Sequence, residues 1–363
     1  MIRNIEKMVI FGVFLCCCAC KGAPSERVDD YVQEHMKEYH VPGVSVAILK
    51  HGNVILSKGY GMANVELGVP ATKDTVYQLA SVTKQFTATG IMMLAEDGKL
   101  SLYDRITQHL SDLPTAWNAV TVRHLLSHTS GIKNYTSTQA YDKSVHDDLT
   151  HREMLDLVAK EPLEFKPGEK FAYSNTGYFL LGMLIEKITG KKYGEFLAER
   201  IFDRIGMKHT RVNDLTAIIP NRAHGYSFHD GILLNGDYVN PTQTFAAGAL
   251  VSTATDLAKW DAALYTGRLL RLSSLEQMWT PAPLSGGETA KYGFGWRVDK
   301  VNGHRLISHG GAVRGFSTQI SRFVDEGLTV IVLINADNGK ADALATGIAQ
   351  RILPTLGEQT SAK

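Results

Sequence analysis

The hydrophobic and polar positions of the first hundred residues alternate between helical and strand patterns. Apolar residues three or four apart predict a helix over residues 26–40, which Ser25 can cap. The apolar runs 44–49 and 54–60 flank a short turn that contains Gly and Asn, so they predict two paired strands. A second helix is predicted over residues 81–97, with the following glycine as its C-terminal stop.

The middle third of the chain is dominated by helical patterns. Residues 178–185 are almost wholly apolar, but this run is too short for a membrane span, which takes about 20 residues. We therefore expect a core helix there, followed by a loop region rich in Gly, Asn and Asp over residues 210–244. The helices predicted in this third include residues 124–128, 152–160 and 177–188.

The last third returns to strand patterns and ends on a helix over residues 340–353. The order of elements predicts an α/β fold, in which an antiparallel sheet is flanked by helices and carries an all-helical insertion. The strands predicted in this third are residues 293–298, 305–308, 316–323 and 328–335.

One domain is expected to follow an N-terminal leader. The leader covers residues 1–20 and the domain about residues 25–355. Within the domain, we assign the α/β part to about 25–110 and 245–355 and the helical part to about 111–244.

The leader has the pattern of an export signal. Basic residues precede the apolar run 8–15, and small residues follow it. Either a signal peptidase cuts after Cys20, or residues 15–20 act as a loose lipobox and Cys20 becomes lipidated. All four cysteines lie in residues 16–20, so at most one remains in the mature chain and no disulfide can form. We expect an exported protein, periplasmic or secreted, with a lipid anchor to the membrane in the second case.

Composition excludes several classes of protein. The chain has 363 residues, of which 44% are hydrophobic and 21% charged, as in ordinary globular proteins. Lys and Arg number 38 against 37 Asp and Glu, which leaves a net charge of +1. A nearly neutral chain lacks the basic stripe that binding to a phosphate backbone requires, so nucleic acid is not an expected partner.

Ser81 and Lys84 form the first candidate catalytic pair. Residues three apart on a helix share a face, with Cβ atoms about 5–6 Å apart, so Lys84 can hold or take the Ser81 proton. Ser81 also falls in the first helical turn, where free N–H groups favour negative charge. Taken alone, the same pattern is typical of a capping serine followed by a solvated lysine.

Tyr173 and Asn175 form a second candidate group, on a loop just before the helix near residue 177. The unperturbed pKa of tyrosine is about 10, and a neighbouring lysine cation would make ionisation easier. The alternative interpretation is a core tyrosine with Asn175 as the helix cap.

The third group is the run His309-Gly310-Gly311-Ala312, predicted to end one strand and precede the next. Its two glycines would let a substrate backbone approach closely. The alternative is a tight hairpin turn.

Taken together, these groups resemble the penicillin-recognising serine hydrolases. The narrower resemblance is to class C β-lactamases, D-Ala-D-Ala carboxypeptidases, D-amino-acid peptidases and family VIII carboxylesterases, and it covers about residues 25–355. It rests on the order S-x-x-K, Y-x-N and [KHW]-x-G. Four further stretches match: VRHLLSHTSGI (122–132), FKPGEKFAYSNTGYFLLG (165–182), AAGALVSTATDLAKW (246–260) and YGFGW (292–296).

The resemblance implies a role for each residue. Ser81 is the implied nucleophile, and Tyr173 the implied general base and later acid. Lys84 would share the Ser81 proton, and whether Lys84 or Tyr173 takes it first stays open. Asn175 would orient Lys84 and the substrate amide, while the N–H groups of Ser81 and Ala312 would form the oxyanion hole. No cofactor is implied.

The resemblance leaves the substrate open between several classes. D-amino-acyl peptides or β-lactams are expected, with short-chain esters as the alternative and a non-catalytic penicillin-binding sensor as the minor one. The third motif reads His309-Gly310-Gly311 where most class C β-lactamases have K-T-G, so strong β-lactamase activity is not expected.

Two further hypotheses concern charge and metal. Arg314 is either a solvated turn residue or the group that binds a substrate carboxylate, helped below about pH 6.5 by a protonated His309. His124 and His128 have the i, i+4 spacing of zinc ligands, but Leu125 replaces the glutamate of zinc proteases, so no metal site is expected.

Overall fold

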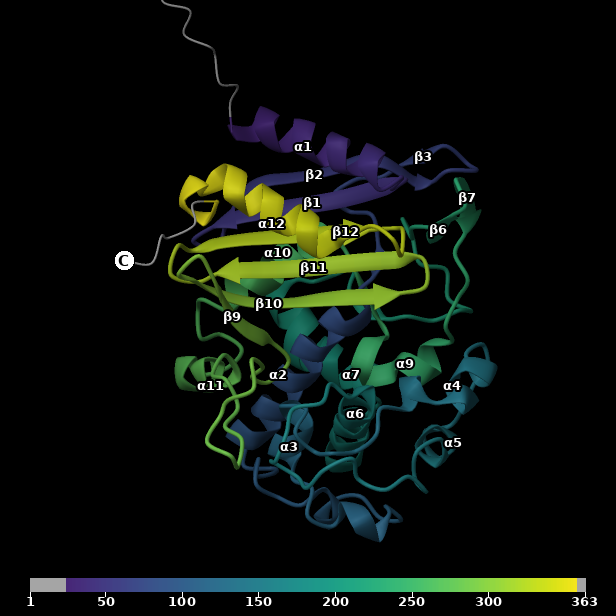
Figure 1. The fold of residues 1–363 in the computed structure, drawn as a ribbon, viewed down its shortest axis with the longest axis vertical. Coiled ribbons are helices and arrows are strands. Elements are labelled where there is room, and N and C mark those ends of the chain that lie inside the picture. Colours follow the sequence, from purple (N-terminus) through teal and green to yellow (C-terminus); the bar gives the residue numbers. More distant parts are fainter. Residues whose placement is uncertain (1–23, 358–363) are drawn as a thin grey trace, which may run out of the picture.

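A seven-stranded antiparallel sheet forms the centre of the protein (Figure 1). The computed structural model describes residues 24–357, so the predicted export signal and Cys20 lie outside the described residues. The strand order is β3-β2-β1-β12-β11-β10-β9. The strands are β1 (Gly43–Lys50), β2 (Asn53–Asn64), β3 (Val69–Pro70), β9 (Arg297–Val301), β10 (His304–Val313), β11 (Phe316–Phe323) and β12 (Leu328–Ile334).

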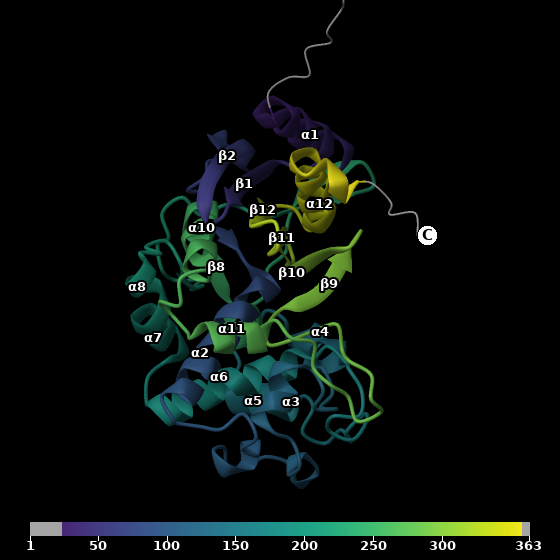
Figure 2. The same cartoon turned by 90° about the vertical axis from the view of Figure 1, so that its left-hand side faces the viewer.

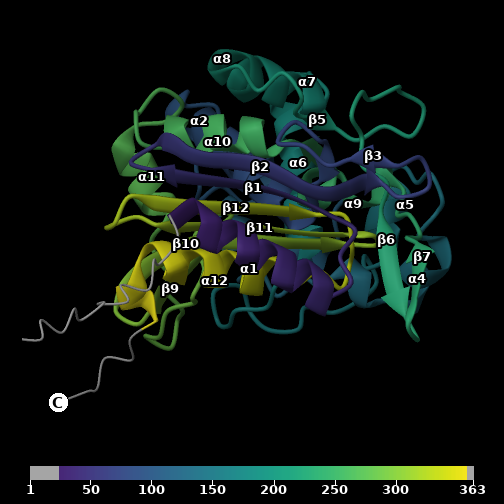
Figure 3. The same ribbon diagram turned by 90° about the horizontal axis from the view of Figure 1, so that it is seen from above.

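Helices cover both faces of this sheet. The first helix, α1 (Pro24–Glu38), and the last, α12 (Ala341–Ile352), lie together on one face, as Figure 3 shows from above. Strands β1 and β12 are buried on both sides, so their sequences are nearly continuous apolar runs. Alternate side chains of β1 and β12 belong to two separate cores, one under α1 and α12 and one on the opposite face.

The opposite face meets α10 (Ala254–Ala263) and the helical block seen below the sheet in Figure 2. Helix α2 (Thr83–Glu96) lies in the middle of this block and is buried along all of its length except its last two residues. It packs against α6 (Asn175–Thr189) and α9 (Pro241–Gly248). The other helices are α3 (Val122–Leu126), α4 (Gln139–Ser144), α5 (His151–Asp156), α7 (Tyr193–Leu197), α8 (Asp203–Ile205) and α11 (Leu272–Met278).

The predicted fold class is confirmed, but several boundaries differ. The region 210–244, predicted to be loop, contains β5 (Arg211–Val212), a hairpin of β6 (Tyr226–His229) and β7 (Ile232–Asn235), and the start of α9. The block predicted as all-helical therefore also carries short strands. Strand β5 joins β4 (Tyr77–Gln78) and β8 (Leu250–Ser252) in a small sheet that no local pattern indicated.

The predicted strand over residues 293–298 begins only at Arg297. A Cβ at Gly293 would lie 2.0 Å from the carbonyl oxygen of Met278, so this stretch is held against α11 and does not join the sheet until later. In the middle third, α5 ends at Asp156 instead of residue 160.

The His309-Gly310-Gly311 run lies inside β10, which corrects its predicted place at a strand end. Strand β10 pairs with β11 as far as Val313, and the turn follows at residues 314–315. The extension past the glycines brings β10 against the segment that carries Ser81.

Gly311 makes this close approach possible. A Cβ at Gly311 would lie 2.2 Å from the backbone oxygen of Leu79 and 2.5 Å from the hydroxyl of Thr318. The same Thr318 hydroxyl donates a hydrogen bond to the Leu79 oxygen at 2.9 Å. Next in the chain, Ala80 has a φ of +47°, a conformation that costs a non-glycine residue about 1–3 kcal/mol. These contacts hold the backbone that leads to Ser81.

We predict that Gly311→Ala lowers the free energy of unfolding by about 1–3 kcal/mol, because the added methyl group meets fixed backbone. Gly310→Ala is the matched control, since the closest atom to a Cβ there would be the movable end of Gln319, at 2.7 Å, and the nearest backbone atom would be 3.6 Å away. Urea unfolding of both variants measures the difference. An equal loss in the two would show that the contact with Leu79 does not constrain β10.

Candidate active site

Ser81 and Lys84 meet where a short 3₁₀ turn leads into a buried helix. Ser81 lies in the turn Ala80–Val82, and Lys84 lies in the first turn of α2. The Lys84 Nζ donates to the Ser81 Oγ at 3.0 Å. The spacing of the two residues in the sequence therefore places them in direct contact, and the hydroxyl that could act as nucleophile touches an amine.

The Lys84 amine has three hydrogen-bond acceptors. They are the Ser81 Oγ at 3.0 Å, the Asn175 Oδ1 at 2.7 Å and the backbone oxygen of Ala247 at 2.8 Å. The side chain is fully buried, and no carboxylate of residues 24–357 forms an ion pair with it. Burial lowers the pKa of Lys84 well below its usual value. A lysine that loses its proton this readily can accept the proton of Ser81.

The Ala247 acceptor depends on an irregular turn in α9. Phe245 has a φ of +35°, which interrupts the helix. The two carbonyl groups that follow face α2, since the Ala246 oxygen accepts from the Thr87 hydroxyl at 2.7 Å and the Ala247 oxygen accepts from Lys84. Sequence analysis missed this contribution, because a backbone carbonyl has no sequence signature.

The Asn175 side chain is oriented by polar neighbours. Asn175 is the first residue of α6, and Ser174 occupies the N-cap position, so Asn175 is not the helix cap. Its backbone N–H donates to the Asn134 Oδ1 at 3.0 Å, and its Nδ2 donates to the Thr136 hydroxyl at 3.3 Å. The amide oxygen is thereby left for Lys84. Sequence analysis did not single out Asn134 or Thr136.

Tyr173 lies over this group and is held in its neutral form. Its ring centroid is 4.9 Å from the Lys84 Nζ. Burial raises the pKa of Tyr173 above its ordinary value, while a hydrogen bond with the Ser81 side chain and the charge of Arg297 oppose the rise. Burial sets the direction of the shift, so the easier ionisation expected beside Lys84 is not found. A neutral Tyr173 suits proton donation to a leaving group, and Arg297 is a neighbour that sequence analysis missed.

His309 is held as a neutral side chain. Its Nδ1 donates to the Gly310 oxygen at 2.7 Å, so its Nε2 accepts from the Tyr292 hydroxyl at 2.9 Å. Burial, with the positive charge of Arg297, lowers the pKa of His309 to about 3. Protonation of His309 is therefore shifted far below the expected pH of about 6.5, and near neutral pH the ring carries no charge for a substrate carboxylate.

Arg314 lines the cavity but already has a partner. It lies in the turn between β10 and β11 and forms an ion pair with Asp237. The second oxygen of Asp237 is 2.9 Å from the His146 Nε2. Arg314 thus already has an anionic partner, which weakens the hypothesis that this residue binds a substrate carboxylate.

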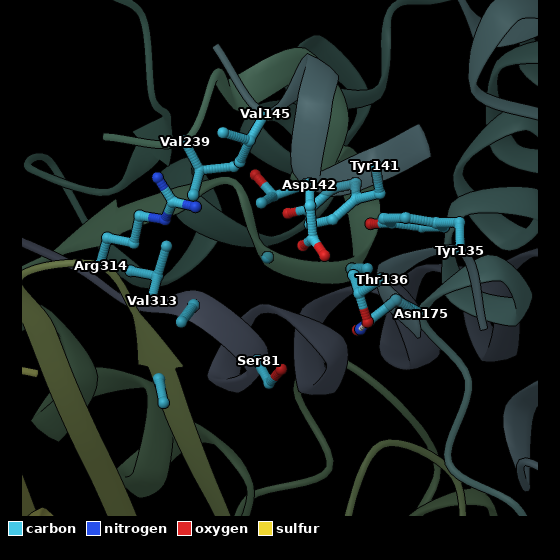
Figure 4. Close-up of a pocket in the computed structure, with 15 residues that line it drawn as sticks. Ser81, Tyr135, Thr136, Tyr141, Asp142, Val145, Asn175, Val239, Val313 and Arg314 are labelled. Carbon is cyan, nitrogen blue, oxygen red and sulfur yellow. Dashed lines mark hydrogen bonds between the residues drawn. The ribbon is translucent and has the colours of Figure 1, made fainter. Parts of the chain in front are cut away.

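A cavity of about 340 Å³ opens above Ser81 (Figure 4), which is enough for a small molecule or a short peptide segment. Asp142 of α4 points into it from the side opposite Ser81, and this carboxylate has no hydrogen-bond or ion-pair partner among the described residues. The lining residues are Ala80, Ser81, Tyr135, Thr136, Tyr141, Asp142, Val145, Asn175, Val239, Thr244, Ala247, Gly248, Ala312, Val313 and Arg314.

The edge of β10 borders this cavity. Strand β9 pairs with β10 only as far as Ser308, so residues 310–312 have no strand partner on that side in the described part of the chain. Ala312 is exposed and lines the cavity with Ser81. An extended substrate segment can therefore pair with this edge. The oxyanion-hole roles of Ser81 and Ala312 stay predictions.

The two histidines with zinc-ligand spacing both accept hydrogen bonds from backbone N–H groups. Helix α3 ends at Leu126, so His128 lies beyond it. The His124 Nδ1 accepts from the backbone N–H of Thr121 at 3.2 Å, and the His128 Nδ1 accepts from that of Ser174 at 3.1 Å. Over residues 24–357, no group of three or more His, Cys, Asp or Glu side chains could hold a metal ion, and no helix is long and apolar enough to cross a membrane.

Most of the chain is similar in sequence to known proteins. Penicillin-binding protein 4* of Bacillus subtilis (strain 168) is 32% identical over 320 residues, which is 84% of this chain and 70% of that protein. Protein flp of Staphylococcus aureus (strain MW2) is 28% identical, over 86% of this chain and 63% of its own length. The chain thus spans only about two thirds of these two relatives.

Solved structures agree with the sequence relatives. The octameric penicillin-binding protein homologue from Pyrococcus abyssi has a TM-score of 0.79 at 31% identity, covering 91% of this chain and 77% of that one. The D-amino acid amidase from Ochrobactrum anthropi SV3, complexed with L-phenylalanine amide, has a TM-score of 0.80 at 29% identity, covering 92% and 99%. The family described as Beta-lactamase matches residues 28–353. The chain therefore belongs to the beta-lactamase family, within the penicillin-recognising serine hydrolases.

Proposed function

We propose that this protein is an exported serine hydrolase that cleaves D-amino-acyl amide bonds through an acyl-enzyme on Ser81. The observation that carries the proposal is the buried Lys84 amine, 3.0 Å from the Ser81 hydroxyl and without a carboxylate partner in the described residues. Two of the similar structures support the choice of bond. They are the D-amino acid amidase and a D-stereospecific amidohydrolase from Streptomyces, the latter 27% identical with a TM-score of 0.75.

The proposed reaction uses Lys84 as the base and Tyr173 as the acid. Neutral Lys84 takes the Ser81 proton while the Ser81 Oγ forms a bond to the substrate carbonyl carbon. The N–H groups of Ser81 and Ala312 stabilise the resulting oxyanion. As the C–N bond breaks, Tyr173 donates its proton to the leaving nitrogen and regains one from Lys84. Water then attacks the acyl-enzyme, its proton returns to Ser81 through Lys84, and the acid product leaves.

The charges of the cavity favour a substrate with a free amino group. Asp142 offers a carboxylate without a partner among the described residues, whereas Arg314 is already paired with Asp237. A substrate ammonium group would gain a charged hydrogen bond at Asp142, and a substrate carboxylate would meet a like charge there. We therefore place D-amino acid amides and amino-terminal D-residues of peptides ahead of β-lactams and of peptides with free carboxyl termini. Neutral esters are the alternative substrates.

We predict that Ser81→Ala abolishes turnover and any covalent adduct, with a rate loss of about 10⁴–10⁶, because the acyl group has no atom to join. Incubation with a D-amino acid amide and with a serine-reactive fluorophosphonate, followed by intact-mass measurement, checks both effects. An adduct that persists in the alanine variant would place the nucleophile elsewhere.

We predict that amide turnover falls as the pH falls through the lowered pKa of Lys84, because the protonated amine cannot accept the Ser81 proton. Lys84→Ala should remove activity. Tyr173→Phe should slow amide cleavage by about 10²–10⁴, but its turnover should still fall at low pH as that of the wild type does. The pH profiles of kcat/KM for wild type and Tyr173→Phe make the distinction. Loss of the acidic limb in Tyr173→Phe would make Tyr173 the base instead.

We predict that Asp142→Asn raises KM for a D-amino acid amide by roughly 10-fold or more, the effect of losing a charged hydrogen bond. The N-acetylated form of the same amide should be unaffected, since it carries no ammonium group. Asp148→Asn is the matched control, because Asp148 is exposed on the same segment but does not line the cavity. Equal effects on free and acetylated substrates would contradict the proposed recognition. A wild-type preference for cephalosporins or nitrophenyl esters over every amide would overturn the substrate class.

A further inference from the structure

We propose that His128 is a positioning residue that holds Tyr173 in place as the proton donor to the leaving group. This inference rests on the proposed hydrolase chemistry but concerns a residue outside the catalytic hydrogen bonds. His128 does not line the cavity, and no hydrogen bond joins it to Ser81 or Lys84 in the described structure. Any effect on the reaction must therefore pass through another residue.

Three successive residues around Tyr173 are bound by His128. The Ala172 N–H donates to the His128 backbone oxygen at 2.9 Å. The Ser174 N–H donates to the His128 Nδ1 at 3.1 Å. Between them, the Tyr173 ring packs on the imidazole, with 4.2 Å between centroids and 38° between planes. One side chain and its own carbonyl thus fix the backbone on both sides of Tyr173 and the orientation of its ring.

The backbone of His128 is adapted to this arrangement. Its φ is +57°, in the left-handed region that is uncommon for residues other than glycine, directly after α3 and its C-cap. Because of this turn, the carbonyl and the ring of one residue both reach the segment before α6. Strained residues of this kind persist where the surrounding structure holds them, and they cluster at functional sites.

The surroundings keep His128 neutral, so that its Nδ1 stays an acceptor. The imidazole is 1% exposed and is enclosed by the rings of Phe171, Tyr178 and Tyr292, with centroids 6.0, 5.0 and 4.6 Å away. Burial lowers the pKa of His128 well below its ordinary value, and the nearby positive charge of Arg297 acts in the same direction. Its proton is therefore on Nε2, away from Ser174.

Two variants separate the parts of this contact. His128→Phe keeps a ring for Tyr173 to pack on but leaves the Ser174 N–H without its acceptor. His128→Asn keeps an acceptor oxygen near the position of Nδ1 and tolerates a positive φ, but it loses the ring. Both replace a neutral side chain with another neutral one, so neither alters the charge around Lys84.

The test compares an anilide with the nitrophenyl ester of the same D-amino acid. A nitrophenolate leaves without a proton, whereas an aniline nitrogen needs the proton of Tyr173. We expect His128→Phe to lower kcat for the anilide by about 10²-fold, the cost of misplacing a catalytic group by about 1 Å, with little change in KM. The kcat of the same variant for the ester should fall much less. The kcat of His128→Asn for the anilide should lie between the values of wild type and of His128→Phe.

The double variant His128→Phe with Tyr173→Phe gives the second readout. If His128 acts through Tyr173, the double variant should be no slower on the anilide than Tyr173→Phe alone. If His128→Phe does not fold, as judged by circular dichroism and thermal unfolding, His128→Asn carries both comparisons. Equal losses on ester and anilide, no loss on either, or additive losses in the double variant would overturn the positioning role. A wild type that cleaves neither compound would instead refute the proposed function.

Discussion

The burial of one amine without a compensating carboxylate is the constraint on which the site depends. Lys84 is fully buried in the first turn of α2, and burial by itself disfavours its charged form. The structure supplies only neutral acceptors, the oxygens of Ser81, Asn175 and Ala247. Asn175 and Ala247 satisfy the two N–H groups of the neutral amine, and its lone pair then faces the Ser81 hydroxyl. The irregular turn in α9 places the Ala247 oxygen against the amine, and the oriented Asn175 amide at the start of α6 supplies the second oxygen.

The same burial sets the protonation states of the neighbouring groups. Tyr173 is kept as a proton donor, and His309 and His128 are kept as neutral rings that bind their neighbours. A positive charge on either histidine would raise the cost of a proton on Lys84, whereas a negative charge on Tyr173 would lower it. The site therefore holds its exchangeable protons on Ser81, Lys84 and Tyr173, and the surrounding side chains hold these three in position.

Substrate choice is separated from this chemistry in space. The charges that a substrate would meet lie at the rim, on Asp142, Asp237 and Arg314. They belong to α4, to the segment before α9 and to the β10–β11 turn, which are far apart in the sequence. A different rim on the same catalytic group would select a different substrate, which is why the fold and the catalytic residues alone do not specify one.

The sequence by itself determined the features that depend on local spacing. The period of apolar residues places the central strands, and a separation of three residues on a helix puts Lys84 against Ser81. The order of three short motifs was enough to indicate the family. The extension of β10 through Gly310 and Gly311 did not follow from local pattern, because it depends on pairing with β11 and on contact with Leu79.

Only the tertiary structure decided the charges and protonation states of the site. Arg314 was a candidate for carboxylate binding until its pairing with Asp237, 77 positions away, was known. His309 was expected to titrate near its ordinary pKa, and Tyr173 below its own, because the sequence gives no measure of burial. His128 shared a spacing with zinc ligands, yet its contacts are with a loop 46 residues further on. Desolvation and long-range pairing arise only when distant segments pack together, so no local pattern encodes them.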